Sequence, residues 1–165
     1  MIKLRSMRES DLSFLERLYG STREEELNQT PWSNEQKQQF IAFQFAAQHE
    51  HYMKHYAGSE FSVVEINGIP AGRLYIARRK AEIRVIELAL MPDFRGHGFG
   101  TGLLNNLIKE SEQSGKSLSI HVEQINPAMR LYKRLGFRKV SEYGIYHLME
   151  RPAGAARAMG MTADR

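Results

Sequence analysis

The sequence predicts an α/β protein in which helices flank a mixed, mostly antiparallel sheet. Three short apolar strand patterns follow one another between residues 61 and 91, joined by turns too short for anything but antiparallel neighbours. A helical pattern over 98–113 separates the last of them, 82–91, from a further strand at 118–122. A strand–helix–strand unit of that length favours two parallel strands. Parallel and antiparallel pairs in one chain indicate a mixed sheet.

The N-terminal part reads as a strand followed by two helices. Residues 2–7 favour an edge strand, and Ser10 and Asp11 are typical helix-start residues. Apolar spacing predicts a helix over 11–19, which the charged segment 21–28 can continue. Ser33 and Gln36 have the form of a capping box, so a second helix is expected over 34–56.

The second helix carries an unusual number of aromatic and histidine side chains. Phe40 and Phe43 are expected in the core, whereas Tyr52 and Tyr56 are candidates for contacts in a substrate cleft. His51 and His55 share a helix face, but no third ligand is specified by spacing, so no metal site is predicted.

The central segment is a strand meander. Gly58 ends the helix, and strands are expected over 61–66, 71–78 and 82–91. Asn67-Gly68 is a strong signal for a tight hairpin turn. The third strand has apolar residues on both faces, which is typical of a strand buried on both sides.

The C-terminal part continues the sheet. Proline at the first turn predicts a short helix over 127–135, and a final hairpin is expected over 137–142 and 145–149. We therefore expect one domain over residues 1–151. Residues 152–165 have no usable periodicity and are expected to be a disordered tail.

Composition places the chain among ordinary globular proteins. Of 165 residues, 42% are hydrophobic and 25% charged, and no apolar run is long enough to cross a membrane. There is no cysteine and no apolar signal-peptide core, which fits a cytoplasmic protein. Residues 124–165 hold eight Lys and Arg against three Asp and Glu, a net charge of +5. Basic residues there are not interleaved with aromatics and match no nucleic-acid motif, so nucleic-acid binding is not expected.

A glycine-rich turn between the strand 82–91 and the next helix is the most informative segment of the sequence. It reads Arg95-Gly-His-Gly-Phe-Gly100, directly after Pro92. Unpaired N–H groups at a helix start favour an anion, and glycines let a phosphate approach the backbone. The spacing is neither the dinucleotide fingerprint nor a P-loop.

This turn resembles the acyl-CoA signature of the GNAT superfamily of N-acetyltransferases, Arg/Gln-x-x-Gly-x-Gly/Ala. Arg95, Gly98 and Gly100 match it, after a Leu-x-Leu-x-Pro lead-in at 88–92. Asn126-Pro-Ala-Met-Arg-Leu-Tyr-Lys-Arg-Leu-Gly-Phe137 is similar to the block that ends the GNAT core. The resemblance covers roughly residues 60–150. It implies six or seven strands, a splayed fourth and fifth strand that hold the pantetheine arm, and about four flanking helices.

The resemblance implies a reaction in which an amine attacks acetyl-CoA directly in a ternary complex, since no cysteine is present to carry the acetyl group. Tyr132 is implied as the acid that protonates the departing thiolate. For the base, Glu87 on the apolar strand, His121 and a water chain all remain open. The residues implied to contact the cofactor are Leu88, Ala89, Leu90, Arg95, Gly96, His97, Gly98, Phe99, Gly100, Thr101, Asn126 and Tyr132.

The acceptor is expected to be a primary amine of a small molecule, peptide or protein, and the sequence does not choose among them. The alternative function is a non-catalytic module that binds acyl-CoA on the same fold. The final hairpin has an exposed strand edge that is a candidate for pairing in a homodimer.

Overall fold

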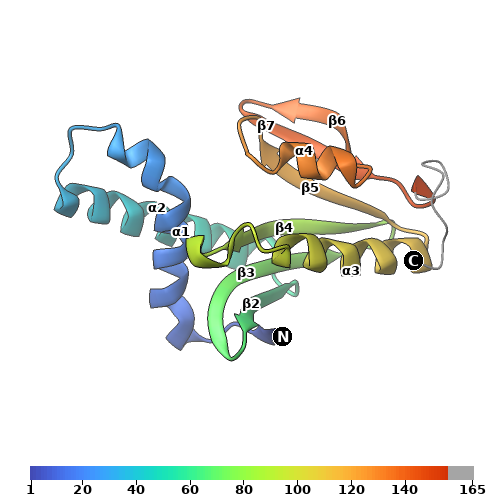
Figure 1. Cartoon of the computed structure of the whole chain (residues 1–165), viewed down its shortest axis with the longest axis horizontal. Coiled ribbons are helices and arrows are strands. Elements are labelled where there is room, and N and C mark those ends of the chain that lie inside the picture. The colour runs from blue at the N-terminus through green and yellow to red at the C-terminus, as the bar shows by residue number, and fades with distance from the viewer. Residues whose placement is uncertain (156–165) are drawn as a thin grey trace. The chain divides into compact units, whose positions relative to one another are not determined.

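The computed structural model describes residues 1–155, and Figure 1 shows their elements in chain order. Seven strands are hydrogen-bonded in the order β1-β2-β3-β4-β5-β7-β6. The sheet is mostly antiparallel, and β4 and β5 form its parallel pair, so the predicted mixed α/β fold is confirmed. By contacts, the chain forms two compact units. Among the described residues, the first comprises 1–75 and 88–99, and the second comprises 76–87 and 100–155.

The first unit contains the N-terminal strand and both long helices. Its elements are β1 (Ile2–Ser6), η1 (Glu9–Asp11), α1 (Leu12–Asn28), α2 (Asn34–His55), β2 (Glu60–Ile66), most of β3 (Ile69–Arg78), the end of β4 (Glu82–Leu90) and η2 (Pro92–Phe94). The predicted capping box is present, with Ser33 Oγ accepting from the Gln36 N–H and Gln36 Oε1 accepting from the Ser33 N–H. Asn67 and Gly68 both have positive φ, 52° and 80°, which is what a tight two-residue hairpin turn requires.

The prediction that Phe43 of α2 lies in the core is wrong. Ile41 and Phe45 carry the buried stripe of α2 and pack with Leu15 and Leu18 of α1. Phe43 lies between Ile41 and Phe45 in sequence, so its side chain points about 200° away from each of them around the helix. It is 71% exposed rather than in the core. Phe40 packs at the edge of this core as expected.

The second unit contains the C-terminal half of the sheet. Its elements are the first part of β4, α3 (Phe99–Ser114), β5 (Ser117–Glu123), α4 (Met129–Arg134), β6 (Arg138–Tyr143) and β7 (Tyr146–Arg151). β7 lies between β5 and β6, so the last strand of the chain is internal and β6 forms the edge (Figure 1). All six residues of β6 are exposed.

The parallel ladder between β4 and β5 is short. It joins Glu82–Val85 to Ser117–Ile120 and ends there. The pairing of β4 with β5 therefore stops at Val85 and Ile120. The expectation that strand 82–91 is buried on both faces is wrong, because only Ile83, Arg84 and Val85 are buried. Residues 86–90 lie beyond the ladder and are half-buried.

The end of the described chain is a turn packed on α3. The Gly154 N–H donates to Glu112, and Ala155 is buried. The remainder of the expected tail, residues 156–165, lies outside the described residues. Among residues 1–155, no helix is both long and apolar enough to cross a membrane.

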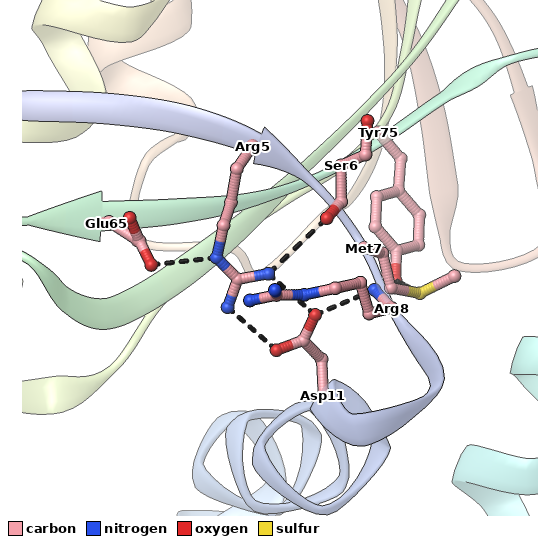
Figure 2. A network of polar contacts seen from close by, with 7 residues as sticks. All are labelled: Arg5, Ser6, Met7, Arg8, Asp11, Glu65 and Tyr75. Atoms are coloured by element: carbon pink, nitrogen blue, oxygen red, sulfur yellow. Dashed lines mark hydrogen bonds and ion pairs between the residues drawn. The ribbon is translucent and has the colours of Figure 1, made fainter.

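A network of charges ties the start of α1 to the first two strands (Figure 2). Arg5 donates two hydrogen bonds of 2.8 Å to the Asp11 carboxylate and one of 2.8 Å to Glu65. Asp11 also accepts from the Arg8 N–H at 2.8 Å. The Arg5 hydrogen bonds hold the pKa of Asp11 at about 2, below its ordinary 3.8, although burial opposes them. A carboxylate that is 7% exposed therefore stays charged and paired.

We predict that Asp11→Asn lowers the free energy of unfolding by about 1–3 kcal/mol at pH 7, because it weakens a buried charge-assisted network. The Asp11 charge stabilises the fold fully above pH 3.8, and this contribution is lost as pH falls toward 2. Urea denaturation at several pH values should therefore show the gap between variant and wild type closing toward pH 2. Glu24→Gln, at an exposed position on α1, is the control and should have little effect at any pH. A gap independent of pH would contradict the assignment.

Candidate functional site

The glycine-rich turn has the backbone that an anion site needs. Gly96 and Gly98 have φ of 76° and 84°, a region that favours glycine, and no atom lies within 4 Å of a Cβ built on either. Glycine is therefore favoured at positions 96 and 98 by the backbone conformation, and not because a side chain would clash with other atoms. Among the described residues, no partner accepts a hydrogen bond from the N–H of Gly96, His97 or Gly98. The three residues are exposed and precede α3, whose first turn contains Gly100 and Thr101.

Arg95 supports this turn from within the first unit. Its Nε donates to the Leu90 carbonyl at 2.8 Å, and its Nη2 donates to Ser21 Oγ on α1 at 3.1 Å. Two guanidinium nitrogens therefore hold the turn against the end of β4 and against α1. These hydrogen bonds give Arg95 a structural role in the turn.

The end of β4 lies unusually close to β3. A Cβ on Gly72 would fall 2.2 Å from the Ala89 oxygen and 2.8 Å from the Leu90 Cδ2. The Met91 N–H donates to the Ala71 carbonyl at 2.7 Å next to this contact. Glycine at position 72 therefore sets how closely β3 can approach residues 89–90.

Tyr132 and Glu87 interact electrostatically in the second unit. Tyr132 is 5% exposed, and its ring meets Phe137 edge-on, with centroids 5.8 Å apart. Burial, together with the negative charge of Glu87, raises the pKa of Tyr132 to about 12. The phenol therefore keeps its proton at neutral pH.

Asn126 acts as a turn cap. Its Oδ1 accepts from the Ala128 N–H at 2.8 Å, just before α4. Its amide nitrogen makes no hydrogen bond to another described residue, so a donor remains for a ligand.

His121 is exposed on β5, one residue beyond the end of the parallel ladder. Its Nδ1 lies 3.4 Å from Arg84 Nη1. Burial of part of the ring, and then the charge of Arg84, lower the pKa of His121, while Glu82 opposes the shift. The imidazole is therefore neutral at pH 7.

Three residues that contact the candidate site, Arg84, Gly72 and Ser21, were not predicted from the sequence. Arg84 gave a signal, since a charge in a strand that is otherwise apolar needs a partner. Gly72 gave another, since glycine inside a strand marks close backbone approach. Ser21 gave none, because its partner Arg95 is 74 residues away.

The aromatic candidates of α2 are engaged inside the first unit. Tyr52 packs edge-on against Tyr75 at 5.7 Å and near the Arg73 guanidinium, and Tyr56 packs against Tyr52. The rings of His51 and His55 are 4.5 Å apart. Within residues 1–155, no group of three or more His, Cys, Asp or Glu side chains is arranged to hold a metal ion.

The architecture is a mixed sheet with a short parallel pair, and a glycine-rich turn and a helix connect the two parallel strands. A model of the acetyltransferase (GNAT) domain matches residues 28–146. The chain belongs to the GNAT acetyltransferase family.

Two curated proteins are similar in sequence. One is an uncharacterized N-acetyltransferase of Methanocaldococcus jannaschii, 38% identical over 93 residues, covering 48% of this chain and 39% of the relative. The other is the [ribosomal protein bS18]-alanine N-acetyltransferase of Haemophilus influenzae, 35% identical over 60 residues, covering 36% and 41%. This chain thus spans about two fifths of the length of the curated relatives it matches.

Solved structures show the same fold. The PaiA N-acetyltransferase of Thermoplasma acidophilum, in complex with coenzyme A, aligns with a TM-score of 0.68 at 17% identity, over 92% of this chain and 99% of that one. The ribosomal-protein-S18-alanine N-acetyltransferase of Escherichia coli aligns with a TM-score of 0.60 at 22% identity, over 92% and 94%. These identities support a common fold and no more.

We predict that Gly72→Ala lowers the free energy of unfolding by about 1–3 kcal/mol, because the added methyl overlaps the Ala89 oxygen and the backbone must move. Urea denaturation measures this directly. Gly102→Ala, in helix α3 with no atom within 4 Å of the new Cβ, is the matched control. It should leave stability unchanged or raise it by up to about 1 kcal/mol. Equal effects of the two substitutions would contradict the close approach.

Proposed function

We propose that this chain transfers the acetyl group of acetyl-CoA to a primary amine. The observation that carries the proposal is Tyr132, a buried, protonated phenol that is within the electrostatic influence of Glu87, in a member of an acetyltransferase family. A structural neighbour that contains coenzyme A supports an acyl-CoA as the donor.

The reaction requires two proton transfers. The neutral amine nitrogen attacks the thioester carbonyl carbon, a C–N bond forms, and the C–S bond breaks. The proton lost by the nitrogen passes to a base, and the departing thiolate receives a proton from Tyr132. Tyr132 carries its proton at neutral pH, so it is the group that we propose as the donor to the thiolate.

Glu87 is the base that we favour. It lies in the same unit as Tyr132, and its charge already influences the phenol. His121 is less suited, because the lone pair of its Nδ1 faces the Arg84 guanidinium. A water chain that ends at Glu87 would perform the same transfer over a longer distance.

We propose that backbone groups make most of the contacts to the cofactor. The unpartnered N–H groups of Gly96 and Gly98, with the start of α3 at Gly100 and Thr101, would hold the pyrophosphate. Backbone groups of 88–90 would hold the pantetheine amides, and the Asn126 amide nitrogen would donate to the cofactor. His97 and Phe99 flank this turn, with rings 6.1 Å apart.

The acceptor is a primary amine, of a small molecule or of a peptide or protein. One relative is an enzyme that acts on an alanine of ribosomal protein bS18, which supports including protein amines in the substrate panel. A cytoplasmic location, suggested by the lack of cysteine, remains a prediction.

We predict that acetyl-CoA and CoA raise the melting temperature, whereas NADH and ATP do not. A ligand at 100 times its dissociation constant should stabilise the protein by about 2.7 kcal/mol. Differential scanning fluorimetry measures the shift, and thiol release with a panel of amines then measures transfer. No shift with either CoA species would refute the proposal. A shift without turnover on any amine would favour the alternative, a non-catalytic acyl-CoA module.

We predict that Tyr132→Phe lowers kcat by roughly 10²-fold, since it removes a positioned proton donor and keeps the ring packed on Phe137. The melting-temperature shift with CoA should remain. Steady-state thiol release provides kcat, and Tyr143→Phe, on the 89%-exposed Tyr143, is the control. Unchanged turnover in Tyr132→Phe would exclude the phenol as the acid.

A further inference from the structure

A buried arginine lies behind His121 in the second unit. Arg84 is 9% exposed, and its Nε donates to the Ser119 Oγ at 2.7 Å. Ser119 is itself fully buried and donates to Glu82 Oε2 at 2.7 Å. Arg84 Nη2 pairs with Glu82 at 3.3 Å. Although burial alone would raise it, hydrogen bonds from Ser119 and Arg79 hold the pKa of Glu82 below its usual range, so the pair stays charged.

This network leaves one end of the guanidinium pointing at His121. Arg84 Nη1 is 3.4 Å from His121 Nδ1. A guanidinium can only donate, so Nδ1 must be the acceptor, and the ring proton of neutral His121 then lies on Nε2. The charges around the ring oppose a second proton, because Arg84 and Arg79 outweigh Glu82. On β7, the residue opposite His121 is the uncharged Leu148.

An imidazole held in this way is a poor base. Nε2 already carries a proton, and the only lone pair, on Nδ1, is directed at a permanent cation. The exposed side of the ring instead presents an N–H donor at the point where β4 and β5 stop pairing.

We propose that His121 donates a hydrogen bond from Nε2 to a carbonyl or carboxylate oxygen of the bound substrates, and that Arg84 is the positioning residue that fixes this tautomer. The inference rests on the proposed function, since it names a second role at the same site. The oxygen belongs either to the acetyl group of the donor or to the amine acceptor. Both sources offer the same chemistry, and kinetics separates them.

The tautomer can be measured without any turnover. Nitrogen-15 NMR of the full chain at pH 7, with His121 assigned by its loss in His121→Gln, should show a neutral ring protonated on Nε2. In Arg84→Met the two tautomers should become mixed. If that variant does not fold, the wild-type spectrum alone decides. A wild-type ring protonated on Nδ1, or on both nitrogens, would overturn the proposal.

Three substitutions of His121 distinguish a hydrogen-bond donor from a general base. Glutamine places an amide N–H near the Nε2 position, whereas asparagine reaches only the Nδ1 position next to Arg84. We expect His121→Gln to lose clearly less kcat/KM than the other two variants, with an unchanged pH profile. His121→Ala and His121→Asn should lose roughly 10²-fold, as removal of a positioned donor does. Equal losses in all three variants, with the acid limb of the pH profile removed, would identify a base and overturn the proposal. Wild-type rates in His121→Ala would also overturn it.

The source of the oxygen follows from the same variants. If the acetyl carbonyl is the partner, His121→Ala should weaken binding of acetyl-CoA but not of CoA in the melting-temperature assay. If the acceptor is the partner, only the KM of the amine should rise. Failure of wild type to bind either CoA species would refute the proposed function, while the NMR result would still test the tautomer.

Discussion

The point at which the parallel pairing of β4 with β5 ends determines where the candidate residues of the second unit lie. Four residue pairs are hydrogen-bonded, from Glu82 and Ser117 to Val85 and Ile120, and then the ladder ends. Glu87 lies two residues beyond the end on β4, and His121 lies one residue beyond it on β5. Residues 86–90 of β4 are half-buried and His121 is exposed, whereas Val122 is buried. The proposed base and the proposed hydrogen-bond donor therefore both lie just beyond the paired part of the two strands.

Charged residues stabilise each unit at positions where apolar side chains would pack more simply. In the first unit, Arg5 and Asp11 bind the start of α1 to β1 and β2. In the second, Arg84 is buried between Ser119 and Glu82. Compared with apolar side chains of similar volume, a buried ion pair contributes little net stability because desolvation offsets attraction, although removing one partner alone is costly. Its directional hydrogen bonds do fix side-chain positions. In the second unit they place Arg84 Nη1 3.4 Å from His121 Nδ1.

The environments of Tyr132 and His121 in the second unit shift the pKa values of these two groups in opposite directions. Burial raises the pKa of Tyr132 and keeps its proton in place, whereas burial of part of the ring and then the charge of Arg84 lower the pKa of His121. Environments that push titratable groups in opposite directions are typical of active sites. Arg95 supports the turn through hydrogen bonds to Leu90 and Ser21. In the proposed site, the backbone N–H groups of the glycine turn are then the groups that would attract an anion.

The sequence alone determined the fold class, most element positions and the family, because these depend on local periodicity, turn residues and two motifs with fixed spacing. Asn67-Gly68, the Ser33 capping box and the Gly96–Gly100 turn are local signals, and each needs only a few neighbouring residues. Only the tertiary structure decided that Phe43 is exposed, that β4 loses its cover after Val85, and that Arg84 faces His121. Those outcomes depend on pairings between residues distant in sequence, where a shift of one position would turn a side chain to the opposite face.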